Sequence, residues 1–363
     1  MLTTITQKFK TGIKRKIIEK TILNQINQRM ISKLMNEINL KKEIKEIKEI
    51  KQKIFQNSFS TKKKTESKII FSMHQELEAK LEEFRKKRNF DPETFCDKKG
   101  EMLNEYMKKF GLKACVIAIS GGIDSAVCFA LCMHAKKLKD SPIERVLGIT
   151  LPIHSTPSHI QRAFDLGKAF DNEVVSVDQT EIHDKLSEIV EKAIGCEKPS
   201  KFARGQFRSY QRTPINYFAT QILGSMGLPA IVIGTGNKDE DGYLRYFCKA
   251  GDGVVDVQLI ADLHKNEVRQ VAKQLGVIES IILAPPSADL WEGQTDEDEI
   301  GFSYDFVELI TDFNDLSTEE QKDFRKSLGL EARQQFDKVF EKAKEIHRKN
   351  AHKVNFPVNL NLL

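Results

Sequence analysis

The residue pattern with the clearest chemical meaning is a glycine- and serine-rich loop that directly follows the apolar run 114–117. A buried strand that opens into such a loop is typical of phosphate-binding sites. Two adjacent glycines let backbone N–H groups point at an anion, hydroxyls add donors, and a carboxylate can hold a divalent cation against the phosphates. The pattern predicts a site for ATP, or at least for its pyrophosphate end. The loop consists of Ala118, Ile119, Ser120, Gly121, Gly122, Ile123, Asp124 and Ser125.

Two other nucleotide-binding motifs are not present in this loop. It lacks the terminal Gly-Lys-Ser/Thr of a Walker A motif and the Gly-x-Gly-x-x-Gly of a dinucleotide fold. The alternative interpretation is a tight structural turn between a strand and a helix.

The loop resembles the SGGxDS loop of the N-type ATP pyrophosphatases (PP-loop enzymes), which cleave ATP between the α and β phosphates and pass AMP to an acceptor. Three later segments look like NAD synthetase, and their order and spacing are similar too. They are residues 234–240 (GTGNKDE), 249–256 (KAGDGVVD) and 286–299 (PSADLWEGQTDEDE). The resemblance covers roughly residues 75–357.

This resemblance implies ATP-dependent amidation of deamido-NAD to NAD through a deamido-NAD adenylate, with release of AMP and pyrophosphate. A carboxylate is a poor electrophile, and attaching AMP turns an oxygen that cannot leave into a phosphate that can. Ammonia is the expected direct nitrogen donor, because the stretch before Met73 is too short and too lysine-rich for an amidase domain. The alternatives are a PP-loop enzyme with another acceptor and a non-catalytic nucleotide-binding subunit of a larger assembly.

The resemblance also implies roles for individual residues. For ATP these are residues 118–125, Thr235, Lys265 and Ser287, with Asp124 and Lys265 as the catalytic pair and Asp124 and Glu240 as Mg²⁺ ligands. For deamido-NAD they are Arg208 or Arg212, Lys249, Asp256, His352 and Lys353. Taken alone, several have simpler interpretations, such as a surface lysine at a helix start for Lys265.

The chain departs from the family pattern at Ala118, where many members have glycine, and at two further places near these residues. One extra residue lies between Glu240 and Lys249, which leaves Asp239 and Asp241 as alternative metal ligands. Two arginines are separated by three residues instead of one, and we prefer Arg212 over Arg208 only slightly. The acidic loop 291–299 is interpreted as a lid that excludes water from the adenylate, with a solvated surface loop as the alternative.

An α/β fold must position these residues. Strand and helix patterns alternate, which predicts a doubly wound parallel sheet of about five strands with flanking helices, as in adenine nucleotide alpha hydrolases. The expected strands are 114–119, 145–151, 173–177, 229–233 and 255–260. The expected helices are 73–110 (one or two), 123–138, 158–170, 181–194, 213–226, 265–275 and much of 303–349. Ligands of such sheets bind at the carboxyl ends of the strands, where the loop and Thr235 both fall.

Composition separates the chain into a catalytic unit, residues 73–363, and a lysine-rich extension, residues 1–72. Met1–Met35 contains a single acidic residue, Glu19, with isoleucines at helical spacing, which resembles a mitochondrial presequence. The alternative is a solvated tail, disordered or weakly helical, without a targeting role. We expect a cytoplasmic protein, or a mitochondrial matrix protein if the extension is a presequence.

Charge, cysteine content and hydropathy limit the classes of partner that we expect for this protein. The net charge of +5 comes largely from the extension, without a basic patch interleaved with aromatics, so nucleic acid is not an expected partner. The six cysteines show no Cys-x-x-Cys pair and are interpreted as free thiols, and no apolar run is long enough to span a membrane. By resemblance alone we expect a homodimer, with a separate amidase partner as an alternative ammonia source.

Overall fold

The computed structural model describes residues 72–286 and 295–354. Expectations for the lysine-rich extension, for Ser287 and for the first part of the acidic loop therefore fall outside the described residues. Within the described residues, no helix has both the length and the apolar character needed to cross a bilayer.

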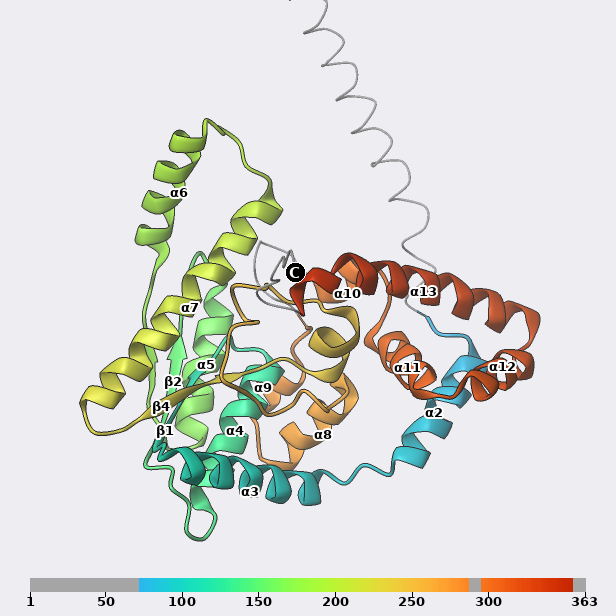
Figure 1. The fold of residues 1–363 in the computed structure, drawn as a ribbon, viewed down its shortest axis with the longest axis horizontal. Coiled ribbons are helices and arrows are strands. Elements are labelled where there is room, and N and C mark those ends of the chain that lie inside the picture. The colour runs from blue at the N-terminus through green and yellow to red at the C-terminus, as the bar shows by residue number, and fades with distance from the viewer. Residues whose placement is uncertain (1–71, 287–294, 355–363) are drawn as a thin grey trace, which may run out of the picture. The chain divides into compact units, whose positions relative to one another are not determined.

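The described residues contain a sheet of five parallel strands (Figure 1). Its spatial order is β3-β2-β1-β4-β5. The strands are β1 (Ala114–Ala118), β2 (Arg145–Thr150), β3 (Val174–Ser176), β4 (Ala230–Gly234) and β5 (Val257–Gln258). The chain winds outward from β1 to β3, then returns to the other side of β1 and continues outward to β5. The predicted doubly wound sheet is confirmed, and its switch point lies between β1 and β4, where ligands bind in such folds.

The central strand is apolar along its whole length because helices cover both faces of the sheet. Residues 114–117 are fully buried. On one face α3 (Pro92–Phe110), α4 (Ile123–Lys137) and α8 (Lys265–Gln274) pack together, and on the other α7 (Lys201–Ser225) packs on β1 and β4 (Figure 1). The connections are completed by α5 (Pro157–Ala169) and α6 (Thr180–Ile194).

A second hydrophobic cluster is built from helices that lie beside the sheet in Figure 1. They are α2 (Gln75–Arg88), α11 (Tyr304–Asp315), α12 (Thr318–Ser327) and α13 (Leu330–Lys349). Phe313, Phe324 and Phe336 pack with ring centroids 5.0–5.1 Å apart in its centre, a spacing typical of stabilising aromatic contacts. Four short elements remain: η1 (Lys238–Leu244), α9 (Glu279–Ile282), α10 (Asp296–Ile300) and η2 (Ala351–Lys353).

Two sequence-based boundaries were wrong, and one element was not predicted. Helix α7 begins at Lys201 and continues through Pro214, because the Ser200 hydroxyl accepts the Ala203 N–H and caps it earlier than the proline suggested. Strand β5 keeps only two of the six expected residues. The acidic residues after Asn237 form a π-helical turn, η1, which has no simple hydrophobic period to reveal it.

Candidate active site

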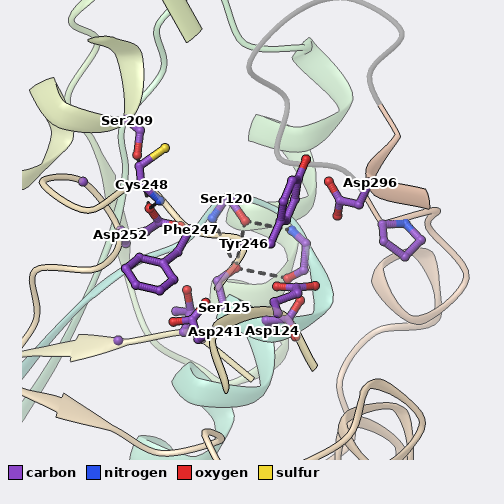
Figure 2. Close-up of a pocket in the computed structure, with 18 of the residues that line it drawn as sticks. Ser120, Asp124, Ser125, Ser209, Asp241, Tyr246, Phe247, Cys248, Asp252 and Asp296 are labelled. Carbon is purple, nitrogen blue, oxygen red and sulfur yellow. Dashed lines mark hydrogen bonds between the residues drawn. The ribbon is translucent and has the colours of Figure 1, made fainter. Parts of the chain in front are cut away.

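A cavity of about 470 Å³ opens at the carboxyl ends of β1 and β4, at the switch point of the sheet (Figure 2). Its lining includes Ser120 and Asp124 from the loop after β1, Thr235 after β4, and Lys265 at the start of α8. Figure 2 shows Asp296 on one side of the cavity and Asp252 on the other. Residues from five distant parts of the chain therefore meet in one space.

The loop after β1 is preorganised by its own hydroxyls. The Ser120 N–H donates to Oγ of Ser125 at 3.2 Å, and the Ser125 hydroxyl donates to the Gly122 carbonyl at 3.1 Å. The Gly122 N–H in turn reaches Oγ of Ser120 at 3.2 Å. These bonds fix the turn that starts α4, whose N-terminus favours negative charge.

Gly121 is required by the shape of this loop. Its φ of +80° lies in the left-handed region, and a Cβ built on it would stand 2.2 Å from the His159 carbonyl oxygen. No other residue type fits there without movement of the backbone. Arg162, also on α5, donates from Nε to the Gly121 carbonyl at 2.9 Å and lines the cavity.

The cavity contains a buried cluster of one lysine and two carboxylates. Nζ of Lys265 lies 2.6 Å from Oδ2 of Asp124 and 2.8 Å from Oε1 of Glu240. Only 3% of the Lys265 side chain is exposed. Burial opposes the charge on the lysine, but the two carboxylates outweigh it and raise its pKa. Lys265 is therefore charged, and it holds the two acids together.

Asn237 links the two carboxylates to the backbone. Its Nδ2 donates to Oδ1 of Asp124 at 2.9 Å, while its Oδ1 accepts the N–H groups of Asp239 and Glu240. The same side chain thus caps η1 and orients the residue at the start of α4. Because Asn237 is fully buried, this geometry is rigid.

Tyr304 closes the cluster from α11. Its hydroxyl donates to Oε1 of Glu240, and its ring centroid lies 4.9 Å from Nζ of Lys265. The hydroxyl is also 3.3 Å from Oδ2 of Asp296. Burial raises the pKa of Asp296 to about 7, with the charge of Glu240 adding to the shift. Burial likewise raises the pKa of Glu240, against the opposing effect of Lys265.

The acids that neighbour Glu240 face other partners. Asp239 is fully buried, with its carboxylate accepting from His264 Nδ1 at 2.7 Å and from the Lys265 N–H at 2.8 Å. Asp241 lines the cavity but accepts from Gln258 Nε2 at 3.3 Å. Of the three consecutive acids, only Glu240 shares the Lys265 ammonium with Asp124.

Only some of the residues expected to hold the acceptor line the main cavity. Arg212 and Lys353 line the cavity. Nε of Arg212 donates to the Leu151 carbonyl at 3.1 Å, and Nζ of Lys353 donates to the Phe247 carbonyl at 2.7 Å. Arg208 instead lines a second cavity between α6 and α7. The two arginines are therefore not equivalent, and the cavity favours Arg212.

Three other expected acceptor residues do not line the main cavity as the structure describes it. Nζ of Lys249 donates to the His352 carbonyl at 2.7 Å, so these two residues contact each other. Asp256 accepts the Val232 N–H at 2.7 Å and so joins the loop before β5 to strand β4. In this arrangement Asp256 supports the sheet.

Sequence reasoning assigned no role to several residues that the structure places in or beside the cluster. Asn237 and Asp296 lie inside the segments that carried the family resemblance, and could have been singled out there. Arg162 and Tyr304 belong to no motif, and only the folded chain brings Arg162 to the cavity and Tyr304 to Glu240 and Lys265.

Comparison with known proteins agrees with this geometry. The family model for NAD synthase matches residues 95–357. An NH₃-dependent NAD⁺ synthetase of Finegoldia magna is 34% identical over 248 residues, covering 68% of this chain and 95% of the relative. One of Methanococcoides burtonii is 38% identical over 201 residues, covering 55% and 71%.

Solved structures also match. An NMN synthetase from Francisella tularensis has a TM-score of 0.61 at 25% identity, covering 75% of this chain and all of the other. An NH₃-dependent NAD synthetase from Campylobacter jejuni has the same fold, with a TM-score of 0.55 at 23% identity, and the coverage is again 75% and 100%. With the loop after β1 and the Lys265 cluster in one cavity, and a family model that spans most of the chain, this protein belongs to the NAD synthase family.

Proposed function

We propose that this protein catalyses the ATP-dependent amidation of deamido-NAD to NAD, with ammonia as the nitrogen donor and AMP and pyrophosphate as products. The observation that carries the proposal is the convergence of the phosphate loop with the Asp124–Lys265–Glu240 cluster at the switch point of the sheet. A non-catalytic nucleotide-binding subunit would not need this buried cluster beside the loop.

The loop after β1 and Lys265 are assigned to ATP. The backbone N–H groups around Gly121 and Gly122 and the N-terminus of α4 provide positive potential for the pyrophosphate end. The Lys265 ammonium can stabilise the negative charge that develops when pyrophosphate departs. Thr235 lines the cavity from the end of β4 and is assigned a further contact to ATP.

Magnesium fits the donor set. Within the described part of the chain no group of three or more His, Cys, Asp or Glu side chains is arranged as a complete metal site. Mg²⁺ at ATP sites commonly uses one or two carboxylates together with substrate phosphates. Asp124 and Glu240 would hold the ion, which supplies charge neutralisation at the phosphates.

Two displacements account for the products. A carboxylate oxygen of deamido-NAD attacks the α-phosphorus of ATP, and the bond from that phosphorus to pyrophosphate breaks. Ammonia then attacks the acyl carbon of the adenylate, AMP leaves with the bonding electrons, and the nitrogen loses a proton. The protein must position both reactants and exclude water from the adenylate, and a buried cavity suits both tasks.

Arg212 and Lys353 are assigned to the acceptor, because both line the cavity and bring positive charge to it. Deamido-NAD carries two phosphates and a carboxylate, and arginine pairs well with such groups.

A homodimer is part of the proposal. The α6–α7 hairpin exposes large apolar side chains, with Ile194 at 75%, Phe218 at 64% and Ile182 at 63%. Exposed large apolar side chains on two neighbouring helices are typical of an interaction surface. Light scattering of the purified protein tests this assignment, and a monomer at micromolar concentration would contradict it.

A direct assay tests the function. Purified protein is incubated with ATP, Mg²⁺ and deamido-NAD, with ammonium or glutamine as nitrogen donor, and NAD, AMP and pyrophosphate are measured together. We expect NAD and AMP in equal amounts with ammonium alone. Nicotinate mononucleotide is tested as a competing acceptor, because one similar structure is that of an NMN synthetase. AMP formation without NAD would overturn the proposed acceptor.

A further inference from the structure

A histidine behind the active-site cavity joins three structural elements. His264 is fully buried immediately before α8. Its Nδ1 lies 2.7 Å from Oδ1 of Asp239 on η1, and its Nε2 lies 3.2 Å from Oδ1 of Asp312 on α11. An ionised carboxylate can only accept a hydrogen bond, so Nδ1 donates to Asp239, while Nε2 faces the Asp312 carboxylate.

The surroundings of the ring support a positive charge. Burial opposes the charge, but Asp239 and Asp312 outweigh it and raise the pKa of His264 to about 9. The Lys238 ammonium, whose Nζ lies 3.2 Å from Nε2, opposes this rise in pKa, and it has carboxylates of its own at 3.6 Å (Asp312) and 3.4 Å (Asp315). Arg88 of α2 and Glu308 of α11 complete the charged groups near this network.

The histidine leads directly to Lys265 through the backbone. Asp239 bonds to His264 through its Oδ1 atom, and its Oδ2 atom accepts the Lys265 backbone N–H at 2.8 Å. The His264 N–H donates to Glu267 at 2.9 Å, and Arg88 pairs with the same carboxylate. The first turn of α8 is therefore fixed on several sides, and Lys265 is the first residue of that turn.

A second connection runs through α11. Asp312 lies on the same helix as Tyr304, whose hydroxyl contacts Glu240 and whose ring covers the Lys265 ammonium. The pairing of His264 with Asp312 therefore ties the helix that carries Tyr304 to the helix that carries Lys265. Backbone and side chain of Lys265 are both held by elements that meet at His264.

We propose that His264 is a positioning residue, which between Asp239 and Asp312 holds the Lys265 ammonium against the phosphates of ATP. This inference rests on the role given to Lys265 in the proposed function. It assigns His264 no contact with substrate, since the ring is fully buried behind the cavity.

A double-mutant cycle separates positioning from general support of the fold. His264→Leu is measured in the wild-type protein and in a Lys265→Met background, with kcat/KM for ATP as the readout and the Kd of Mg·ATP where turnover is too slow. We expect a loss of about tenfold or more in the wild-type background and less than about twofold in the Lys265→Met background. Equal losses in both backgrounds would overturn the inference.

A matched control is Glu308→Gln. Glu308 is also a buried carboxylate of α11, but it pairs with Arg85 of α2 at 2.6 Å. It is expected to lower thermal stability while changing kcat/KM by less than about threefold. A loss as large as that of His264→Leu would show that any weakened ion pair on α11 impairs the site, and would overturn the assignment.

Asp312→Asn replaces His264→Leu in the double-mutant cycle if circular dichroism shows that His264→Leu does not fold. It weakens the link from the ring to α11 while Asp239 still pairs with His264. The same cycle against Lys265→Met is expected to be non-additive, and additivity would overturn the inference. If the wild-type protein binds Mg·ATP but forms no NAD, only the proposed function is refuted. The role of His264 is then still tested by the double-mutant cycle with the Kd of Mg·ATP as the readout.

Discussion

Nζ of Lys265 lies 2.6 Å from Oδ2 of Asp124, although the two residues are 141 positions apart in the chain. Asp124 follows β1, and Lys265 follows β5, which lies beyond β4 in the sheet. Parallel strands bring their carboxyl ends to one edge, and the switch point leaves room there for a ligand. The fold thereby converts two residues at distant helix starts into one charged pair.

Lys265→Met is expected to reduce kcat/KM for ATP by about 100-fold or more, a loss typical of removing one preorganised group from a charged transition state. The change also leaves Asp124 and Glu240 without their shared cation. Steady-state NAD formation measures the effect. The control is Lys273→Met, an exposed lysine on the last turn of the same helix, which should stay within about twofold of wild type. Similar losses in both variants would contradict the role of Lys265.

Gly121→Ala is expected to lower the free energy of unfolding by about 1–3 kcal/mol, because the residue has a φ of +80° and a Cβ there meets the His159 carbonyl. Gly122→Ala is the matched control. Gly122 has a φ of −94°, and the nearest atom to its added Cβ is Oγ of Ser120 at 3.3 Å. Urea denaturation of both variants should show the larger loss for Gly121→Ala. The reverse order would mean that the loop is not strained at Gly121.

The sequence predicted the fold well because the signals were local. The apolar run before Ser120 and the helix period after it predicted β1 and α4 to within one residue, and the parallel sheet followed from alternating patterns. The start of α7 was not predicted, because Pro214 inside the helix is tolerated once Ser200 caps it upstream. Local patterns identify elements, whereas tertiary packing decides their ends.

The candidate site was predicted only where a motif carried it. Asp124, Glu240 and Lys265 were expected near one another, and the structure brings them within hydrogen-bonding distance. Asp256 and Lys249 were expected beside the acceptor, but their side chains bond to backbone groups. Such contacts depend on how η1 and β5 pack, and no spacing in the sequence encodes them.

Tyr304→Phe tests the hydroxyl that Glu240 accepts. The variant keeps the ring over Lys265 and removes one hydrogen bond to a charged group, which is worth about 1.5–3 kcal/mol. We expect kcat/KM for ATP to fall about tenfold or more. Tyr106→Phe, which changes an exposed tyrosine of α3, is the control and should leave kcat/KM unchanged. A Tyr304→Phe enzyme with full activity would show that Lys265 and Asn237 suffice to hold Glu240.

Glu240→Gln tests the proposed magnesium ligand. We expect the Mg²⁺ concentration for half-maximal activity to rise about tenfold or more, because a neutral amide is a poorer ligand for a hard cation than a carboxylate. Asp241→Asn, at the next position in η1, should give a much smaller shift, because Asp241 contacts Gln258 and not Lys265. A larger shift for Asp241→Asn would transfer the ligand role to that residue.

The stability of the protein should depend on pH through His264. Its pKa is about 9 in the folded protein and 6.5 without the fold. Below pH 6.5 the ring is protonated in both states and its stabilisation is fully present. As the pH rises from 6.5 to 9, the unfolded chain loses the proton first, so up to about 3 kcal/mol of stability is lost over this window.

Urea denaturation between pH 6.5 and 9 measures this loss, and His264→Gln should remove most of it because the amide does not titrate. The pKa of Asp296 is raised to about 7, so the unfolded chain loses this proton before the folded protein does. Asp296 therefore lowers the stability of the protein over a different window, as the pH rises from about 4 to 7. Asp296→Asn should therefore flatten the profile below pH 7 and leave the decline above it. A His264→Gln variant whose stability still falls as steeply between pH 7 and 9 would show that the ring is not an imidazolium between Asp239 and Asp312.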